Sequence, residues 1–499
     1  MIELKLMQPT AIAYIALFAV TALLYYLVPD KTFSGGRHPV NLRNVWLLIA
    51  CIIFIGISDI RFAAVAMAAA VFTYGSGRLI GSSGAMAKAV LAIHIAGILA
   101  LVVVLRYFAA QTRLMESGLN EGIVVPVGIM IYSLKAISYT AGIYRGEVRG
   151  DTSFLDCLLY LLFFPVLMVG PIEEPESFTA KLHQKHPLRF ENLQQGFLLI
   201  LWGFLLKLVL ADNIAVFADR VFKDDFKGIS GAIVLVTALL LTIQIYATFY
   251  GLSAVAAGYS RILGFEIPDN FTAPFLAPSM RSFRKGWNAT LNSWNEKNIY
   301  EPLTSIRAKD EREHRLYNVF CLLLMTLFIG LWYGKATHYL VGAIGLGLYE
   351  IIESALICRP RRNGNGVAAD RGLPRAIMTA VRFAVVTIAC MFFRSRRLSL
   401  VLLAVRKILT AFKAGTLHNG TFFKMGFWPR YWVLIIAGIA VLLIADICKN
   451  RGVVLHKWIS QRFFIIRWAA YISAFVIILI FGCWGFGYHQ PHVLCNFLY

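Results

Sequence analysis

The sequence predicts an all-α, multi-pass membrane protein. Of its 499 residues, 59% are hydrophobic and only 15% are charged, and the mean hydropathy is +0.68. A soluble core does not absorb so much apolar surface, whereas each transmembrane helix needs roughly 20 apolar residues in a row. Such runs recur from one end of the chain to the other, with basic residues clustered between them. We expect about 11 spans, together with re-entrant or interfacial helices.

Each apolar run is expected to be a helix, because the bilayer core offers no water to the backbone hydrogen-bonding groups. The clearest runs are Thr10–Val28, Phe62–Tyr74, Val90–Val104, Phe197–Leu210, Ala232–Ala254, Tyr317–Leu331, Ala380–Phe393, Tyr431–Ile447 and Trp468–Phe486. We see no internal repeat, low-complexity tract or soluble domain between them. Residues 1–499 are therefore predicted to form a single membrane domain.

The positive charge is distributed as expected for a membrane protein. The formal net charge is +21, and its basic residues gather in short connections between apolar runs. The most basic connection, Arg359–Arg375, contains five arginines. Arginine-rich loops resist translocation, so we place this loop in the cytoplasm, against anionic lipid headgroups. The expected partners of this surface are membrane lipids and not nucleic acid.

The eight cysteines predict neither a disulfide framework nor a zinc site. Most lie inside apolar runs, and none forms a Cys-x-x-Cys pair. We expect no metal and no bound cofactor.

The largest polar interruption is the segment 279–303, "SMRSFRKGWNATLNSWNEKNIYEPL". It is too polar to span the membrane and too aromatic for a free loop. Its apolar residues (Trp287, Leu291, Trp294) and its asparagines (Asn288, Asn292, Asn295) each recur at helical spacing. Each set would therefore lie along one face of an amphipathic helix. That helix is either anchored at the interface by its tryptophans or re-entrant, lining a cavity inside the membrane.

Several stretches resemble the bacterial membrane-bound O-acyltransferases, in family order and over nearly the whole chain. They are "NLRNVWLLIACIIFI" near the N-terminus, "VPVGIMIYSLKAISYTAGIYRGE" (Val125–Glu147), "FFPVLMVGPIEEPESF" (Phe163–Phe178), "LWGFLLKLVLADNIA" (Leu201–Ala215) and "RILGFEIPDNFTAPFL" (Arg261–Leu276). The nearest likeness is to the membrane proteins of alginate O-acetylation and of teichoic acid D-alanylation.

The resemblance implies a ring of helices around a central funnel in the inner membrane. An acyl group would enter from a cytoplasmic thioester, carried by an acyl carrier protein or by coenzyme A, and leave on a hydroxyl at the outer face. It also implies an extracytoplasmic acyltransferase subunit as a partner. The chemistry needs a general base near the hydroxyl, and histidine suits that role because its pKa lies near neutrality.

Both histidine positions of the family are changed in this chain. Asn288 follows Trp287 in "KGWNATLNSW", and Tyr333 follows Trp332 in "GLWYG". Asparagine hydrogen-bonds but does not titrate, and tyrosine titrates near ~10. Asn288 and Tyr333 thus mark the catalytic positions without an obvious base, and Trp287, Trp294 and Trp332 are expected to line the cavity.

Other reactive family positions are changed as well. "IQIYATFYGLSAVAAG" has Thr248 and Ala254 at the family's two aspartates. The Arg-Asp pair that follows the first histidine reads Glu296-Lys297. His338 lies five residues beyond Tyr333, about 140° around a helix, and His94 lies alone in an apolar run, so both are expected to be packed residues.

The chain ends in "VLCNFLY", which resembles a Phe-Ile-Tyr ending found in the family. The resemblance implies an acyl relay at Tyr499; the alternative is an aromatic anchor at the membrane interface.

Three functions remain open. The chain is an O-acyltransferase acting on an extracytoplasmic envelope polymer, a catalytically silent subunit that scaffolds an acylation or export complex, or a conduit for a lipid or acyl group. Inverted repeats would favour the conduit, and we see none.

Overall fold

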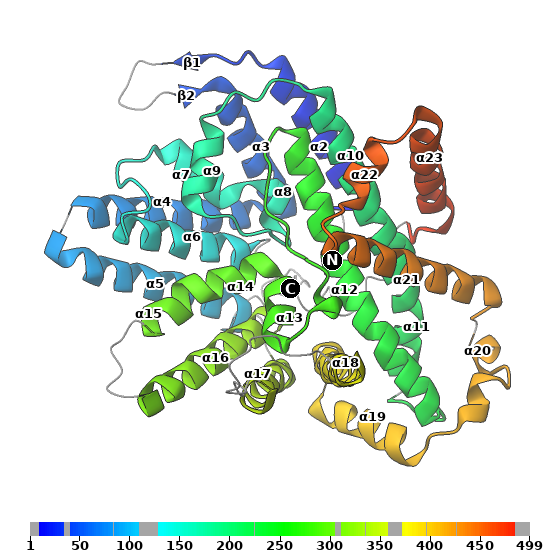
Figure 1. Cartoon of the computed structure of the whole chain (residues 1–499). Coiled ribbons are helices and arrows are strands. Elements are labelled where there is room, and N and C mark those ends of the chain that lie inside the picture. Colours follow the sequence, from blue (N-terminus) through cyan, green and yellow to red (C-terminus); the bar gives the residue numbers. More distant parts are fainter. Residues whose placement is uncertain are drawn as a thin grey trace, which may run out of the picture. The chain divides into compact units, whose positions relative to one another are not determined.

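The computed structural model describes residues 9–33, 40–82, 84–108, 128–223, 225–304, 311–334, 336–357, 372–395, 397–425 and 427–484. Helices dominate this part of the chain (Figure 1), and its only strands are the antiparallel pair β1 (Thr32–Phe33) and β2 (Val40–Asn41). The predicted all-α class is therefore confirmed.

Eight helical stretches within the described residues are long and apolar enough to cross a membrane. They are Ile60–Ser82, Gly84–Arg106, Phe190–Phe222, Gly231–Ile262, Arg315–Tyr333, Ala376–Arg394, Pro429–Asn450 and Phe464–Phe481. Two shorter apolar helices, Ile12–Leu27 and Leu42–Ile57, add to them. The chain is a multi-pass membrane protein, as its composition predicts.

The residues fall into two compact units, described here one at a time. Unit 1 comprises the described residues up to Trp202 together with Leu252–Asp269, and unit 2 comprises Gly203–Gly251 and the described residues from Asn270 onward. Helices α10 (Phe190–Phe204) and α12 (Gly231–Ile262) contribute residues to both units. The single membrane domain inferred from the sequence stays a prediction.

Unit 1 is built around three helices, α4, α5 and α6, that pack against one another. Its described helices are α2 (Ile12–Leu27), α3 (Leu42–Ser58), α4 (Ile60–Ser82), η1 (Gly84–Met86), α5 (Ala87–Val103), η2 (Val104–Phe108), α6 (Ile129–Tyr144), α7 (Phe154–Leu162), α8 (Phe164–Leu167) and α9 (Pro175–Leu182). Side chains of the family-like stretches fix the surrounding helices. For example, Asn44 Nδ2 donates a hydrogen bond to the carbonyl of Leu182 (3.1 Å), and Trp46 Nε1 donates to the carbonyl of Thr21 (3.1 Å).

His94 lies fully buried among these three helices. Its Nε2 is 3.2 Å from Thr73 Oγ1, and its Nδ1 is 3.0 Å from Thr140 Oγ1. The imidazole also stacks on Phe72, with ring centroids 5.1 Å apart. Because both ring nitrogens have protein partners, His94 is a packed residue, as the sequence predicts.

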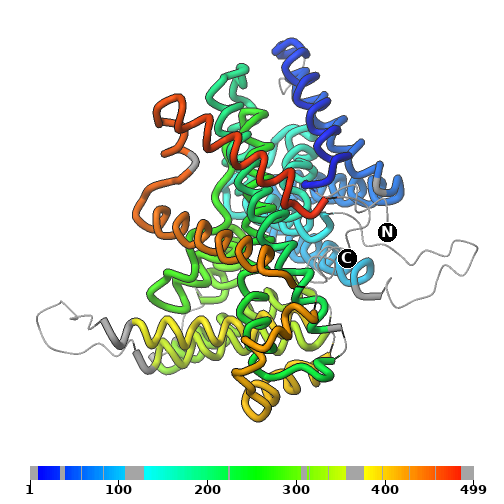
Figure 2. The backbone as a smooth tube through the Cα atoms, turned by 90° about the vertical axis from the view of Figure 1, so that its right-hand side faces the viewer, coloured from blue at the N-terminus to red at the C-terminus, as the bar shows by residue number. Residues whose placement is uncertain are grey.

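Unit 2 holds the remaining helices, and in it α16, α17 and α18 lie side by side (Figure 1). Besides its parts of α10 and α12, its described helices are η3 (Leu205–Ala211), α11 (Asp212–Lys223), η4 (Pro274–Leu276), α13 (Met280–Gly286), α14 (Ala289–Asn295), η5 (Glu296–Tyr300), α15 (Glu301–Thr304), α16 (Glu311–Tyr333), α17 (Thr337–Ile357), α18 (Gly372–Arg394), α19 (Leu398–Thr410), η6 (Ala414–Leu417), α20 (Thr421–Lys424), α21 (Pro429–Asn450), α22 (Leu455–Ser460) and α23 (Phe464–Phe481). Figure 2 shows α21 in orange and α23 in red.

The family-like stretch "LWGFLLKLVLADNIA" forms a π-helical turn around a buried ion pair. Lys207, in η3, bonds to Asp212 at the start of α11, and both side chains are almost completely buried. Asn213 Nδ2 donates a hydrogen bond to the carbonyl of Phe481 (3.1 Å), which ties α11 to the end of α23. These polar residues at membrane depth have protein partners, as their position requires.

The basic loop Arg359–Arg375 lies largely outside the described residues, as does Tyr499. The cytoplasmic placement of this loop stays a prediction.

Candidate functional site

The segment 279–303 is a series of short helices with a sharp break at the first predicted site position. α13 ends at Gly286, Trp287 is extended, and α14 begins at Ala289. Between them Asn288 adopts a left-handed conformation with a φ of 48°. The continuous amphipathic helix expected from the two residue stripes is therefore wrong. The break follows from pairing with another part of unit 2, since Trp287 forms an antiparallel bridge with Phe271.

Asn270, in the family-like stretch "RILGFEIPDNFTAPFL", holds the start of α14. Its carbonyl accepts a hydrogen bond from the backbone N–H of Ala289 (2.7 Å). Its side-chain oxygen accepts two more, from the backbone N–H (3.1 Å) and the hydroxyl (2.8 Å) of Thr290. Helix N-termini present N–H groups that need such acceptors. Asn270 thus caps α14 in place of Asn288, whose own side chain makes no capping bond.

The conformation of Asn288 is itself unusual. A non-glycine residue in the left-handed region costs on the order of 1–3 kcal/mol, although asparagine tolerates it better than most residues. Asn288 is only 6% exposed. Its left-handed conformation is therefore not that of a residue in a solvent-exposed loop. The hydrogen bonds that Asn270 accepts stabilise the turn. They thereby fix the direction of the Asn288 side chain.

Tyr333 is the last residue of α16 and is buried. Its ring stacks on Phe393 of α18, with centroids 4.9 Å apart and an interplanar angle of 17°. Its hydroxyl oxygen accepts a hydrogen bond from Trp287 Nε1 (2.9 Å). Tyr333, at the end of α16, is therefore joined by a direct hydrogen bond to Trp287, the residue before Asn288 at the α13–α14 break.

The end of α16 requires glycine after the tyrosine. The backbone N–H of Gly334 still bonds to the carbonyl of Gly330 (3.2 Å). A Cβ at position 334 would lie 2.6 Å from Cδ2 of Tyr339 and closer still to two other atoms of that ring. A side chain at position 334 would overlap this ring. Gly334 therefore allows α17 to begin close to the end of α16, where Tyr333 lies.

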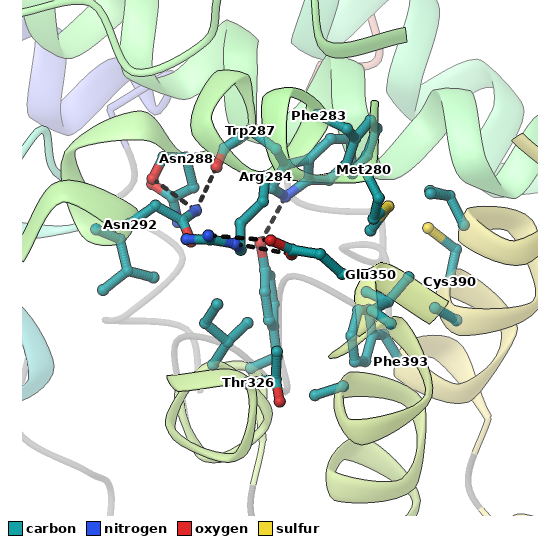
Figure 3. A pocket seen from close by; sticks show the side chains of 17 residues that line it. Met280, Phe283, Arg284, Trp287, Asn288, Asn292, Thr326, Glu350, Cys390 and Phe393 are labelled. Carbon is teal, nitrogen blue, oxygen red and sulfur yellow. Dashed lines mark hydrogen bonds and ion pairs between the residues drawn. The ribbon is translucent and has the colours of Figure 1, made fainter. Parts of the chain in front are cut away.

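Asn288 and Tyr333 line one small cavity of about 60 Å³ in unit 2, shown in Figure 3. Its lining residues are Met280, Phe283, Arg284, Trp287, Asn288, Leu291, Asn292, Thr326, Ile329, Tyr333, Ala343, Leu346, Glu350, Val386, Ala389, Cys390 and Phe393. Since a water needs roughly 10–15 Å³ measured in this way, the space holds about four to six small atoms. The wall is mostly apolar, with a few polar side chains placed on it.

A larger, charged cavity of about 650 Å³ shares two residues with the small one. Arg284 and Glu350 line both. The guanidinium of Arg284 grips the Glu350 carboxylate with two hydrogen bonds, Nε to Oε2 at 3.0 Å and Nη2 to Oε1 at 3.2 Å (Figure 3). Such fork-like pairs are strong and fix the orientation of both groups. The ion pair therefore forms a common wall between the apolar and the charged cavity.

A second ion pair anchors α13 on the side of the larger cavity. Glu353, one turn after Glu350 on α17, accepts a hydrogen bond from the backbone N–H of Met280 at the start of α13. It also pairs with Arg382 of α18 (3.1 Å), which in turn donates to the carbonyl of Pro278 (2.9 Å). Sequence analysis missed this arrangement. Its signal was present in "YEIIES", where two carboxylates stand three residues apart in an otherwise apolar helix.

The other sequence-predicted residues lie elsewhere in unit 2. Trp294 is buried and stacks on Phe328 (centroids 5.4 Å apart), and Trp332 is 1% exposed, but neither is among the residues lining the two cavities described above. His338 is also buried, with its ring against Tyr339, and does not line the small cavity. The roles of Asn288, Tyr333 and the tryptophans in catalysis stay predictions.

A further polar pair escaped sequence analysis. The hydroxyl of Tyr246 donates to the carboxylate of Asp446, which is 1% exposed, at 3.0 and 2.9 Å from its two oxygens. The Tyr246 ring also stacks on Trp287, with centroids 5.6 Å apart. Asp446 stands near the end of the run Tyr431–Ile447, where an acidic residue reads as the edge of a span. Its burial among aromatic rings comes from packing that the sequence does not reveal.

The lining of the small cavity contains few groups that titrate near neutral pH. None of its 17 lining residues is a histidine, and Glu350, their only carboxylate, is held by Arg284. Asparagine does not titrate near neutral pH, and tyrosine ordinarily titrates near ~10. In the part of the chain that the structure describes, no three His, Cys, Asp or Glu side chains gather closely enough to hold a metal ion.

The comparison with known protein families agrees with the family-like stretches. The model of the membrane-bound O-acyltransferase family matches residues 111–348, which include both Asn288 and Tyr333. A probable alginate O-acetylase of Pseudomonas aeruginosa is 28% identical over 389 residues, covering 75% of this chain and 69% of the relative. Residues 111–348 of this chain are therefore similar to the membrane-bound O-acyltransferase family.

Other relatives of this chain are named for different polymers. A peptidoglycan O-acetyltransferase of Helicobacter pylori is 24% identical, covering 77% of this chain and 76% of the relative. A teichoic acid D-alanyltransferase of Bacillus subtilis is 24% identical, covering 45% of this chain and 57% of the relative. The family therefore includes proteins named for acetyl and for D-alanyl transfer.

Proposed function

We propose that this chain takes part in the O-acylation of an extracytoplasmic cell-envelope polymer by passing an acyl group across the inner membrane. The match of residues 111–348 to the membrane-bound O-acyltransferase family supports this proposal, as do the relatives named for alginate, peptidoglycan and teichoic acid. The membrane-spanning helices place the chain in the membrane that such a transfer has to cross.

One observation carries the proposal at the level of the site. Asn288 and Tyr333, which we predict to occupy the positions of the family histidines, line one small apolar cavity that shares the Arg284–Glu350 wall with a larger charged cavity. An acyl thioester has a polar carrier and a compact apolar acyl group, and two adjoining cavities of these kinds suit the two parts. Its carrier would be an acyl carrier protein or coenzyme A.

In this proposal Asn288 orients a reacting group by a hydrogen bond, Tyr333 packs against the cavity while hydrogen-bonded to Trp287, and neither residue abstracts a proton. The Trp287–Tyr333 hydrogen bond supports this role, since Trp287 has only an N–H to donate and uses the tyrosine oxygen as its acceptor. The aromatic packing around Asn288 and Tyr333 would be formed by Trp287, Trp294 and Trp332. Tyr499 would relay the acyl group to an extracytoplasmic acyltransferase subunit.

A second candidate is a catalytically silent subunit that scaffolds an acylation complex. The absence of histidine from the residues that line the cavity favours it. In that case a histidine-bearing member of the same family would perform the transfer, and this chain would supply only its helices and binding surfaces.

The proposed function is tested in cells that lack this chain. Ester-linked acyl groups released from purified envelope polymers by mild base are expected to fall sharply and to return when the wild-type chain is supplied. Unchanged ester content in every polymer fraction would contradict the proposal. Purified chain that transfers acyl groups from a labelled thioester to a polymer hydroxyl without a second family member would exclude the silent subunit.

A further inference from the structure

Two residues that line the small cavity each carry a buried polar atom for which the described residues provide no partner. One is Oδ1 of Asn292, a residue that is 4% exposed. The other is Nη1 of Arg284, whose side chain is 10% exposed. Both residues line the cavity of about 60 Å³ (Figure 3). A buried polar atom without a hydrogen-bond partner is costly, so both atoms favour a ligand that completes their bonding.

The orientation of the Asn292 amide is fixed by its neighbours. Its Nδ2 donates to the carbonyl of Trp287 (2.7 Å) and lies 3.4 Å from the carbonyl of Asn288. The reverse orientation would place the amide oxygen against two carbonyl oxygens, and oxygens of this kind only accept. The break in the helix therefore holds Oδ1 free as an acceptor.

The Arg284 guanidinium is fixed in the same way. Two of its nitrogens grip the Glu350 carboxylate, so the planar group cannot turn without breaking both bonds. Its third nitrogen, Nη1, remains as a donor with a fixed direction. Two residues that line this small cavity thus carry one buried acceptor and one buried donor of fixed direction.

We propose that Arg284 Nη1 and Asn292 Oδ1 bind the two reacting groups, the acyl carbonyl oxygen and the acceptor hydroxyl, respectively. This inference takes its choice of reacting groups from the proposed function. In the transfer, the hydroxyl oxygen forms a bond to the carbonyl carbon, the bond from that carbon to the thioester sulfur breaks, and the hydroxyl proton ends on the departing thiolate. A donor aimed at the carbonyl oxygen stabilises the negative charge that develops there. The size of the cavity restricts the acyl group to a short one.

Two small probes of nearly equal size test the pair without any acyl transfer. Acetamide has a carbonyl oxygen and N–H donors, whereas acetone has only the carbonyl. Ligand-observed NMR titrations of the purified full chain in detergent micelles are expected to give saturable binding of both. Acetamide is expected to bind about tenfold more tightly, because only its N–H meets Asn292 Oδ1.

Variants assign each contact. Asn292→Ala is expected to weaken acetamide by about tenfold and to leave acetone unchanged. Arg284→Lys keeps a cation beside Glu350 but removes the third nitrogen, so both probes are expected to weaken. Matched controls are Asn298→Ala, which removes a similar bond to the carbonyl of Trp294 (3.0 Å), and Arg145→Lys, which makes the same change in a two-bond pair with Glu147 of unit 1. Neither control residue lines the small cavity, so neither is expected to change binding.

Equal affinities of the two probes in the wild type, or no saturable binding, would overturn the inference; this comparison stands even where a variant fails to fold. The result is separate from the proposed function. Probe binding with the expected pattern, combined with unchanged polymer esters in cells lacking the chain, would leave the polar pair standing and reject acyl transfer.

Discussion

The polar cluster around His94 and the cavity beside Tyr333 are both buried, yet their hydrogen bonding differs. His94 has a threonine partner for each ring nitrogen, so no polar atom of its imidazole is left for a ligand. In the small cavity, Asn292 Oδ1 and Arg284 Nη1 have no such partner among the described residues. The histidine thus only packs, whereas two residues that line the small cavity keep polar atoms without a described partner. Burial is common to both clusters; what distinguishes them is unsatisfied hydrogen-bonding capacity in residues that line a cavity.

The largest expected effect on stability comes from Gly334→Ala, which disturbs the end of α16 beside the small cavity. The added methyl group would overlap the Tyr339 ring, and overpacking of this kind costs about 1–3 kcal/mol. The free energy of unfolding in detergent should fall accordingly, and the presentation of Tyr333 should be disturbed. Gly345→Ala in α17 is the control: nothing lies within 4 Å of its Cβ, and alanine there is expected to be neutral or to stabilise the helix. Equal stability of both variants would show that the tight end of α16 is not required.

A smaller effect is expected from His94→Leu, which tests the packed side. The hydroxyls of Thr73 and Thr140 also lie within hydrogen-bonding distance of carbonyls of their own helices, so both can donate to a carbonyl after the substitution. The loss of stability should therefore be about 1 kcal/mol, the usual value for a hydrogen bond. Acyl transfer per folded molecule should not change. A variant that folds normally but transfers no acyl group would show that His94 takes part in the chemistry and does not only pack.

The smallest effect concerns His183, a partly exposed histidine outside the spans. Its hydrogen bond with Asp156 (3.0 Å) raises the pKa of His183 above its ordinary value in the folded chain. The protonated form is thus favoured by folding, and its stabilising contribution is complete below the unfolded pKa of about 6.5. That contribution is lost as the pH rises through the raised folded pKa.

Thermal unfolding measured on both sides of this range should show the loss in the wild type and a flatter profile in His183→Gln. The exposed His418 supplies the matched control, since His418→Gln is expected to retain the wild-type profile. An identical profile in His183→Gln would contradict the assignment to this histidine.

The helical spans were predictable because apolar runs of this length have few other structures in a membrane. The break at Asn288 was not. The spacing of Trp287, Leu291 and Trp294 continues across it as in one helix, and the interruption is imposed by Asn270 and Phe271 through long-range hydrogen bonds. A periodic pattern reports local preference, and tertiary pairing overrode it here.

The candidate site was predictable only in part, for a related reason. Family resemblance identified Asn288 and Tyr333, which do line one cavity. It did not identify Arg284, Asn292 or Glu350, because their importance depends on which atoms remain unbonded after packing. Tyr499 and most of the loop Arg359–Arg375 lie outside the described residues, so their roles stay predictions.

The central claim is that the position of the second family histidine now acts through packing and hydrogen bonding. The most direct test is the rate of acyl transfer per folded molecule in Tyr333→Phe. The control is Tyr339→Phe, since Tyr339 is also buried and stacks on Phe393 but does not line the cavity. The account predicts little change in either variant, apart from some loss of stability where Trp287 Nε1 loses its acceptor. A loss of roughly 10²-fold or more in Tyr333→Phe alone, the usual scale of general acid–base help, would contradict it and make the tyrosine hydroxyl the group that moves the proton.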